Sequence, residues 1–147
     1  MRQAWPAALL MLLQPATIAN AADLAVLYGS WDPGGSAFEG EGLLTVTDKS
    51  IDWGGCRGIP YRVASDRQLE TYLGDWLHRS PKTGLTWRVI ALELLDGGCI
   101  DKFMPGTGYL QFAIPSDMPA HADIVFYASP EGLAEGVFSW GVFGRAQ

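Results

Sequence analysis

The sequence predicts an all-β fold, mainly antiparallel, in the form of a single small barrel or sandwich of about eight strands. Short apolar and aromatic segments recur about every dozen residues, each bounded by Pro, Gly, Asp or Ser, which is typical of such folds. Residues 85–95 (LTWRVIALELL) form a near-unbroken apolar run that Arg88 and Glu93 interrupt. A strand with apolar residues on both faces needs cover on both sides, so we expect it at the centre of the domain.

A helix is the alternative for residues 85–95, because Trp87, Ile90, Ala91 and Leu94 also lie at helical spacing. The β-branched and aromatic residues of the segment, and the glycine pair that follows it, favour the strand. A strand would place Trp87 and Ala91 on one face and Ile90 and Leu94 on the other.

Residues 1–21 resemble a secretory signal peptide. Arg2 supplies the positive start, residues 7–13 the short apolar segment, and Ala-Asn-Ala at 19–21 the small residues of a cleavage site. A buried N-terminal helix is the alternative, which the two prolines of the segment disfavour. We therefore expect a single domain of residues 22–147, periplasmic or secreted, with no membrane anchor.

The chain is acidic, with a formal net charge of −6. Removal of the first 21 residues takes away Arg2 and no acid, which leaves nine basic and sixteen acidic residues and a net charge of −7. Such a chain lacks the basic surface that neutralises phosphates, so we expect no nucleic-acid partner. The acidity permits a basic protein partner.

The two cysteines, Cys56 and Cys99, are expected to form one disulfide in an oxidising compartment. A redox-active pair is the alternative, but it needs a C-x-x-C spacing or a setting that favours the thiolate, and neither is visible. The bridge would close a loop of about 43 residues, for which the chain-entropy account gives roughly 4 kcal/mol of stability.

The other expected strands are short. Asp-Pro-Gly-Gly at 32–35 breaks the first strand, and Asp48-Lys49 is a two-residue turn between the second and third. These strands cover residues 24–31, 43–47, 50–53, 59–64, 108–114, 123–128 and 137–144.

Residues 66–79 predict one short helix instead. Leu69, Tyr72, Leu73 and Trp76 fall at helical spacing, and Ser80-Pro81 is a plausible stop. A strand hairpin that turns at Gly74-Asp75 is the alternative.

Two positions resemble the pattern of lipocalins and the wider calycins. Gly29-Ser30-Trp31 gives a G-x-W on the first strand, and Arg145 follows the last strand. The resemblance implies an up-and-down barrel in which the arginine packs on the tryptophan and closes one end. An indole face accepts a guanidinium, and joining the first and last strands removes exposed edges. An unrelated β-sandwich or barrel stays open as the alternative.

No catalytic motif is present, so we expect no catalytic residues, no metal site and no cofactor. His78 and His121 are isolated and are interpreted as surface residues. The enzyme alternative is an envelope hydrolase that uses loop carboxylates, such as the pairs Glu39/Glu41 or Asp96/Asp101, with one of these histidines.

The favoured hypothesis is an exported binding or interaction protein, one that inhibits or sequesters a basic protein. Its candidate contact loop runs over residues 31–42 and contains Trp31, an exposed Phe38, Glu39 and Glu41. The alternative is a carrier of a small apolar ligand, of the calycin type. An eight-stranded barrel is either filled by its side chains or holds one small ligand, and the many bulky rings favour a filled interior.

Overall fold

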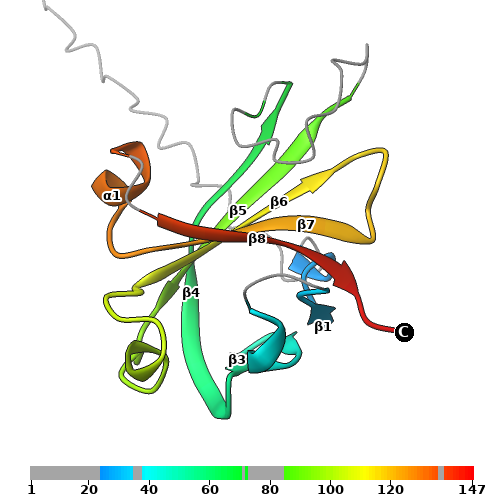
Figure 1. Ribbon diagram of the computed structural model, residues 1–147. Coiled ribbons are helices and arrows are strands. Elements are labelled where there is room, and N and C mark those ends of the chain that lie inside the picture. The colour runs from blue at the N-terminus through cyan, green and yellow to red at the C-terminus, as the bar shows by residue number, and fades with distance from the viewer. Residues whose placement is uncertain (1–23, 35–37, 71, 73–84, 136–137) are drawn as a thin grey trace, which may run out of the picture.

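The computed structural model describes residues 24–34, 38–70, 72, 85–135 and 138–147. Over these residues it contains eight antiparallel strands in one closed barrel (Figure 1). Each strand pairs with the next along the chain, and β8 pairs with β1. The strands are β1 (Gly29–Asp32), β2 (Leu44–Val46), β3 (Ser50–Trp53), β4 (Cys56–Leu69), β5 (Trp87–Leu94), β6 (Tyr109–Pro115), β7 (His121–Tyr127) and β8 (Phe138–Arg145). The predicted all-β fold is confirmed, and it is a barrel.

Short helices lie in the connections between strands. They are the 3-10 helices η2 (Glu39–Glu41) and η3 (Ile100–Lys102) and the α-helix α1 (Pro130–Ala134). Because the strands run alternately up and down, η2, η3 and α1 lie at the same end of the barrel, which we call the mouth. The opposite end, which we call the base, holds residues 24–28, the β2–β3 and β6–β7 turns and the end of β8.

Arg145 and Trp31 close the base. Trp31 is fully buried, and its indole Nε1 donates a 3.0 Å hydrogen bond to the carbonyl of Leu27. Arg145 lies opposite Trp31 in the β1–β8 pair, and its guanidinium carbon is 4.4 Å from the centroid of the Trp31 ring. The same guanidinium donates to the carbonyls of Val26 and Tyr28, and burial lowers its pKa from the ordinary value.

Aromatic rings fill the barrel from the base towards the mouth. Trp31 contacts Phe112 with the ring centroids 6.0 Å apart, and Trp53 stacks on Phe126 at 4.8 Å with an interplanar angle of 12°. Phe143 is also fully buried, and its ring centroid lies 6.3 Å from those of both Trp53 and Phe126. The interior is therefore filled by side chains, as the number of bulky rings predicts.

The strand predicted at residues 85–95 is confirmed as β5 and is buried on both faces. Ile90 and Leu92 belong to the core inside the barrel. Trp87 and Val89 belong to a second cluster on the outer face, with Leu69 and Tyr72 packed against it. The long β4 pairs with β3 through its first half and with β5 through its second half.

Two predicted elements are wrong. Residues 24–28 do not extend the first strand: Leu27 N donates to Leu24 O, which forms a turn whose carbonyls receive Trp31 and Arg145. The helix predicted over 66–79 is wrong for residues 66–69, which pair with β5 as part of β4. Pairing with β5 gives the backbone groups of residues 66–69 hydrogen-bond partners. The stability of this pairing outweighs the preference for a helix that the spacing of the apolar residues indicates. Residues 73–79 lie outside the described part of the chain.

The predicted disulfide is present. Cys56 and Cys99 are bonded with their Cα atoms 5.8 Å apart, so the bridge ties the start of β4 to the β5–β6 loop.

We predict that the double substitution Cys56→Ser, Cys99→Ser lowers the free energy of unfolding by about 2–4 kcal/mol, because the unfolded chain regains the freedom of the closed loop. Urea unfolding followed by tryptophan fluorescence measures the loss. Reductant should destabilise the native protein to a similar extent and leave the variant unchanged. Equal stability of the two proteins would contradict the prediction.

We also predict that Arg145→Lys destabilises the barrel by about 1–3 kcal/mol, because lysine keeps the charge but cannot reach two carbonyls with one planar fork. The matched control is Arg57→Lys, whose side chain is 86% exposed and which should stay within about 0.5 kcal/mol of the native protein. Thermal unfolding of both variants checks the difference, and an equal effect would argue against closure by Arg145.

Candidate functional site

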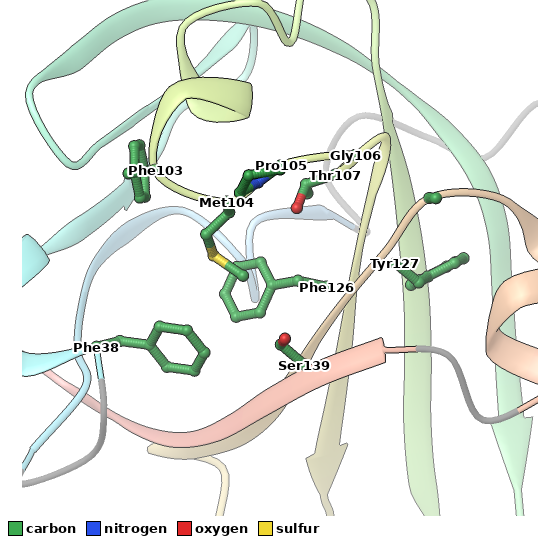
Figure 2. Close-up of a pocket in the computed structure, with 10 residues that line it drawn as sticks. Phe38, Phe103, Met104, Pro105, Gly106, Thr107, Phe126, Tyr127 and Ser139 are labelled. Atoms are coloured by element: carbon green, nitrogen blue, oxygen red, sulfur yellow. The ribbon is translucent and has the colours of Figure 1, made fainter.

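A cavity of about 430 Å³ opens at the mouth of the barrel (Figure 2). Four segments that are distant in sequence form its wall: the β1–β2 connection, the β5–β6 loop, the end of β7 and the start of β8. The lining residues are Phe38, Phe103, Met104, Pro105, Gly106, Thr107, Phe126, Tyr127, Ala128 and Ser139.

Aromatic rings form the floor of the mouth cavity. Phe38 and Phe126 lie with their centroids 5.1 Å apart, and the rings of both contact Trp53. Figure 2 shows Met104 reaching towards the Phe126 ring, while the ring of Tyr127 points away from it. The difference follows from the strand, since successive side chains of β7 face opposite sides of the sheet.

The β5–β6 loop is held in shape by its own contacts. Ile100 is fully buried, and Phe103 packs edge-on against Trp53 with the centroids 5.2 Å apart. Asp101 Oδ1 accepts a 2.7 Å hydrogen bond from Gly106 N. With Cys99 tied to β4, these contacts give the cavity a preformed wall.

Gly54 allows Phe103 to reach that position. Its φ of +58° belongs to the left-handed region, and a Cβ at this position would lie 2.4 Å from the Phe103 ring. A side chain at position 54 would therefore strain the turn and push Phe103 out of its place against Trp53.

The residues that line the mouth cavity include few polar side chains. Thr107 and Ser139 contribute hydroxyls to its wall, and Figure 2 shows the Ser139 side chain directed towards Phe126. The cavity thus combines an aromatic floor with hydroxyl groups, each of which can donate one hydrogen bond and also accept hydrogen bonds.

Phe38 of the candidate contact loop does not lie as predicted. Phe38 is half-buried rather than exposed, because it packs between Trp53, Phe126 and Phe143. Trp31 lies buried inside the barrel. Phe38 is therefore part of the floor of the cavity, and the prediction that it is exposed is wrong.

Glu41 lies beside a second hollow of about 240 Å³ on the outside of β2 and β3. Asp52 also lines this hollow and accepts a 2.6 Å hydrogen bond from Gly58 N, while the exposed Leu43 forms its edge. Arg57 approaches Asp52 to 4.0 Å. The acidic residues near the contact loop are thus brought to one place beside an exposed apolar side chain.

Within the described residues, His121 does not meet the carboxylates of the enzyme alternative in these cavities. His121 begins β7 at the base and is not among the residues that line the mouth cavity. Asp101 is occupied in its loop, as described above, and His78 lies outside the described residues. Among the described residues no group of three or more His, Cys, Asp or Glu side chains could hold a metal ion, and no helix is long and apolar enough to cross a membrane.

Phe103, Met104, Thr107 and Ser139 were not identified from the sequence. Three of them lie in one glycine- and proline-containing loop, where large apolar residues are unusual. Phe103 and Met104 in such a loop were the signal that the sequence offered, because an up-and-down barrel brings its alternate connections to one end.

No known protein family, no curated protein and no solved structure matches the chain. The function is therefore inferred from the chemistry of its own side chains.

Proposed function

We propose that this protein binds a small, mainly apolar ligand at the mouth of its barrel. The observation that carries the proposal is the 430 Å³ cavity, whose floor is made by Phe38 and Phe126 and whose wall is made by Phe103 and Met104. Cavities for small molecules in proteins are typically about 300–1,000 Å³, mainly apolar, with a few polar groups that orient the ligand.

The filled interior sets the depth at which a ligand would bind. Trp53 and Phe143 are buried inside the barrel and contact Phe38, so a ligand would rest on the rings rather than enter the barrel interior. An aromatic or flat apolar molecule suits such a floor, since it could stack on or meet the edges of the rings. Thr107 and Ser139 would supply its hydrogen bonds.

The resemblance to lipocalins and calycins supports the same proposal, because the base is closed and the mouth is hollowed in a manner that suits a ligand carrier. The disulfide supports export to the periplasm or beyond, where such bonds persist. Binding without chemical conversion is favoured because hydroxyls and rings, rather than paired titratable groups, face the cavity.

The uncharged fluorescent probe N-phenyl-1-naphthylamine tests this proposal. We expect its emission to rise on binding to the native protein and to reach saturation. Ser139→Trp should reduce binding at least about tenfold, because a large side chain there would fill the cavity above Phe126. The matched control is Ala120→Trp, at an exposed position in the β6–β7 turn of the base, which should bind the probe like the native protein. Equal binding by both variants would refute the proposal.

A basic protein partner is the second candidate, and the hollow beside Glu41 and Leu43 favours it. A cationic side chain could meet Glu41 and Asp52 there while Leu43 covers apolar surface of the partner.

We predict that immobilised protein captures lysozyme, used as a basic secreted hydrolase, and that Glu41→Lys weakens this capture by about tenfold. The control Glu135→Lys makes the same charge change at the end of α1. A similar loss in both variants would show that net charge alone governs the contact and would remove this candidate.

A further inference from the structure

A third hollow, of about 270 Å³, lies on the outside of the barrel, where α1 faces β4, β5, β6 and β7. Its walls include Ser65 and Arg67 of β4, Tyr109 and Tyr127, and Leu133 of α1. It is separate from the mouth cavity, because the sheet lies between them and the Tyr127 ring points away from that cavity (Figure 2).

A β-bulge in β4 puts the polar groups into this outer hollow. Val63 pairs with Leu92 and packs against the core inside the barrel. A regular strand would place residues 65 and 67 on that same inner face. The register shifts after Val63, however, so that Ser65 pairs with Ala91 and Arg67 with Val89, on the outer face. Bulges commonly redirect side chains in this way next to binding sites.

No described carboxylate forms an ion pair with Arg67. Arg57, Arg62 and Arg88 each lie within 4.0 Å of a carboxylate, and Arg145 binds carbonyls at the base. The guanidinium of Arg67 has no hydrogen bond or ion pair in the part of the chain that the structure describes. The described residues that line the outer hollow include no Asp or Glu, although the chain is acidic as a whole.

The other lining groups suit a ligand with one ring and one charged end. Tyr109 and Tyr127 are stacked with centroids 5.2 Å apart and an interplanar angle of 15°. Burial raises the pKa of Tyr127 to about 12, and the nearby charge of Arg67 opposes the rise, so the Tyr127 hydroxyl remains a donor at neutral pH. Ser65 adds another hydroxyl, and Leu133 adds apolar surface.

We propose that the outer hollow is a binding site for a small anion, a carboxylate or phosphate attached to a compact apolar or aromatic group, with Arg67 as its counter-ion. Arginine presents a planar fork of donors that fits the oxygens of either anion. At about 270 Å³ the site is below the usual range for larger ligands, so a molecule of about one ring is the expected size. This proposal is independent of ligand binding at the mouth.

Benzoate and phenyl phosphate are the probes, with benzamide as the uncharged analogue, each titrated into 15N-labelled protein at constant ionic strength. We expect saturable shifts of the Ser65, Arg67 and Tyr109 amides with at least one anion, and markedly weaker binding of benzamide. The anion that binds more tightly shows whether the site prefers a carboxylate or a phosphate group on its ligand. Absence of saturable shifts with both anions, or equal binding of benzamide, would overturn the proposal.

Arg67→Gln should weaken binding of the preferred anion at least about tenfold, since it removes a charged hydrogen-bond donor. The matched control is Arg62→Gln, the same charge change on the same strand at a residue paired with Glu93, which should leave binding within about twofold. Ser65→Leu keeps Arg67 but fills the hollow, so it should also weaken binding at least about tenfold. Equal weakening by Arg62→Gln and Arg67→Gln would show that the effect comes from net charge alone and would refute the proposal that Arg67 binds the anion.

Discussion

The contact of Arg145 with Trp31 and with the carbonyls of residues 24–28 fixes the rest of the barrel. It joins the last strand to the first, so no strand edge is left open, and it blocks the base with a buried ring. From there Phe112, Phe143 and Trp53 fill the interior towards the other end. An eight-stranded barrel has little more room than its own side chains need. Free volume inside the barrel therefore remains where the strands end, at the mouth.

Closure also gives every strand two distinct faces, and β7 uses both of them. Phe126 faces inward and forms the floor of the mouth cavity, while its neighbour Tyr127 faces outward and stacks on Tyr109. In β4 the bulge after Val63 changes which residues face outward. A one-residue shift thus converts positions that would lie in the core into the polar wall of an outer hollow.

The strands that are marked by apolar residues in a regular pattern along the chain could be predicted from the sequence. The apolar run of β5 and the even spacing of β6, β7 and β8 are local properties, and the disulfide follows from two cysteines in a chain whose sequence predicts export. The second half of β4 could not, because its bulge breaks the alternation and its stability depends on pairing with β5. Residues 24–28 are apolar like a strand, but their carbonyls are needed as acceptors for Trp31 and Arg145.

The candidate sites depend on contacts between distant segments, which explains why the sequence identified so few of their residues. Phe38 lies in a glycine-rich loop and was expected to be exposed, yet three rings from β3, β7 and β8 bury one side of it. Arg67 looks like any surface arginine until the register shows which arginines have carboxylate partners. In an acidic chain an arginine that forms no ion pair with any described carboxylate is more informative than the charge of the whole protein. The same net charge that disfavours nucleic acid as a partner is therefore compatible with a small anion held at one local site.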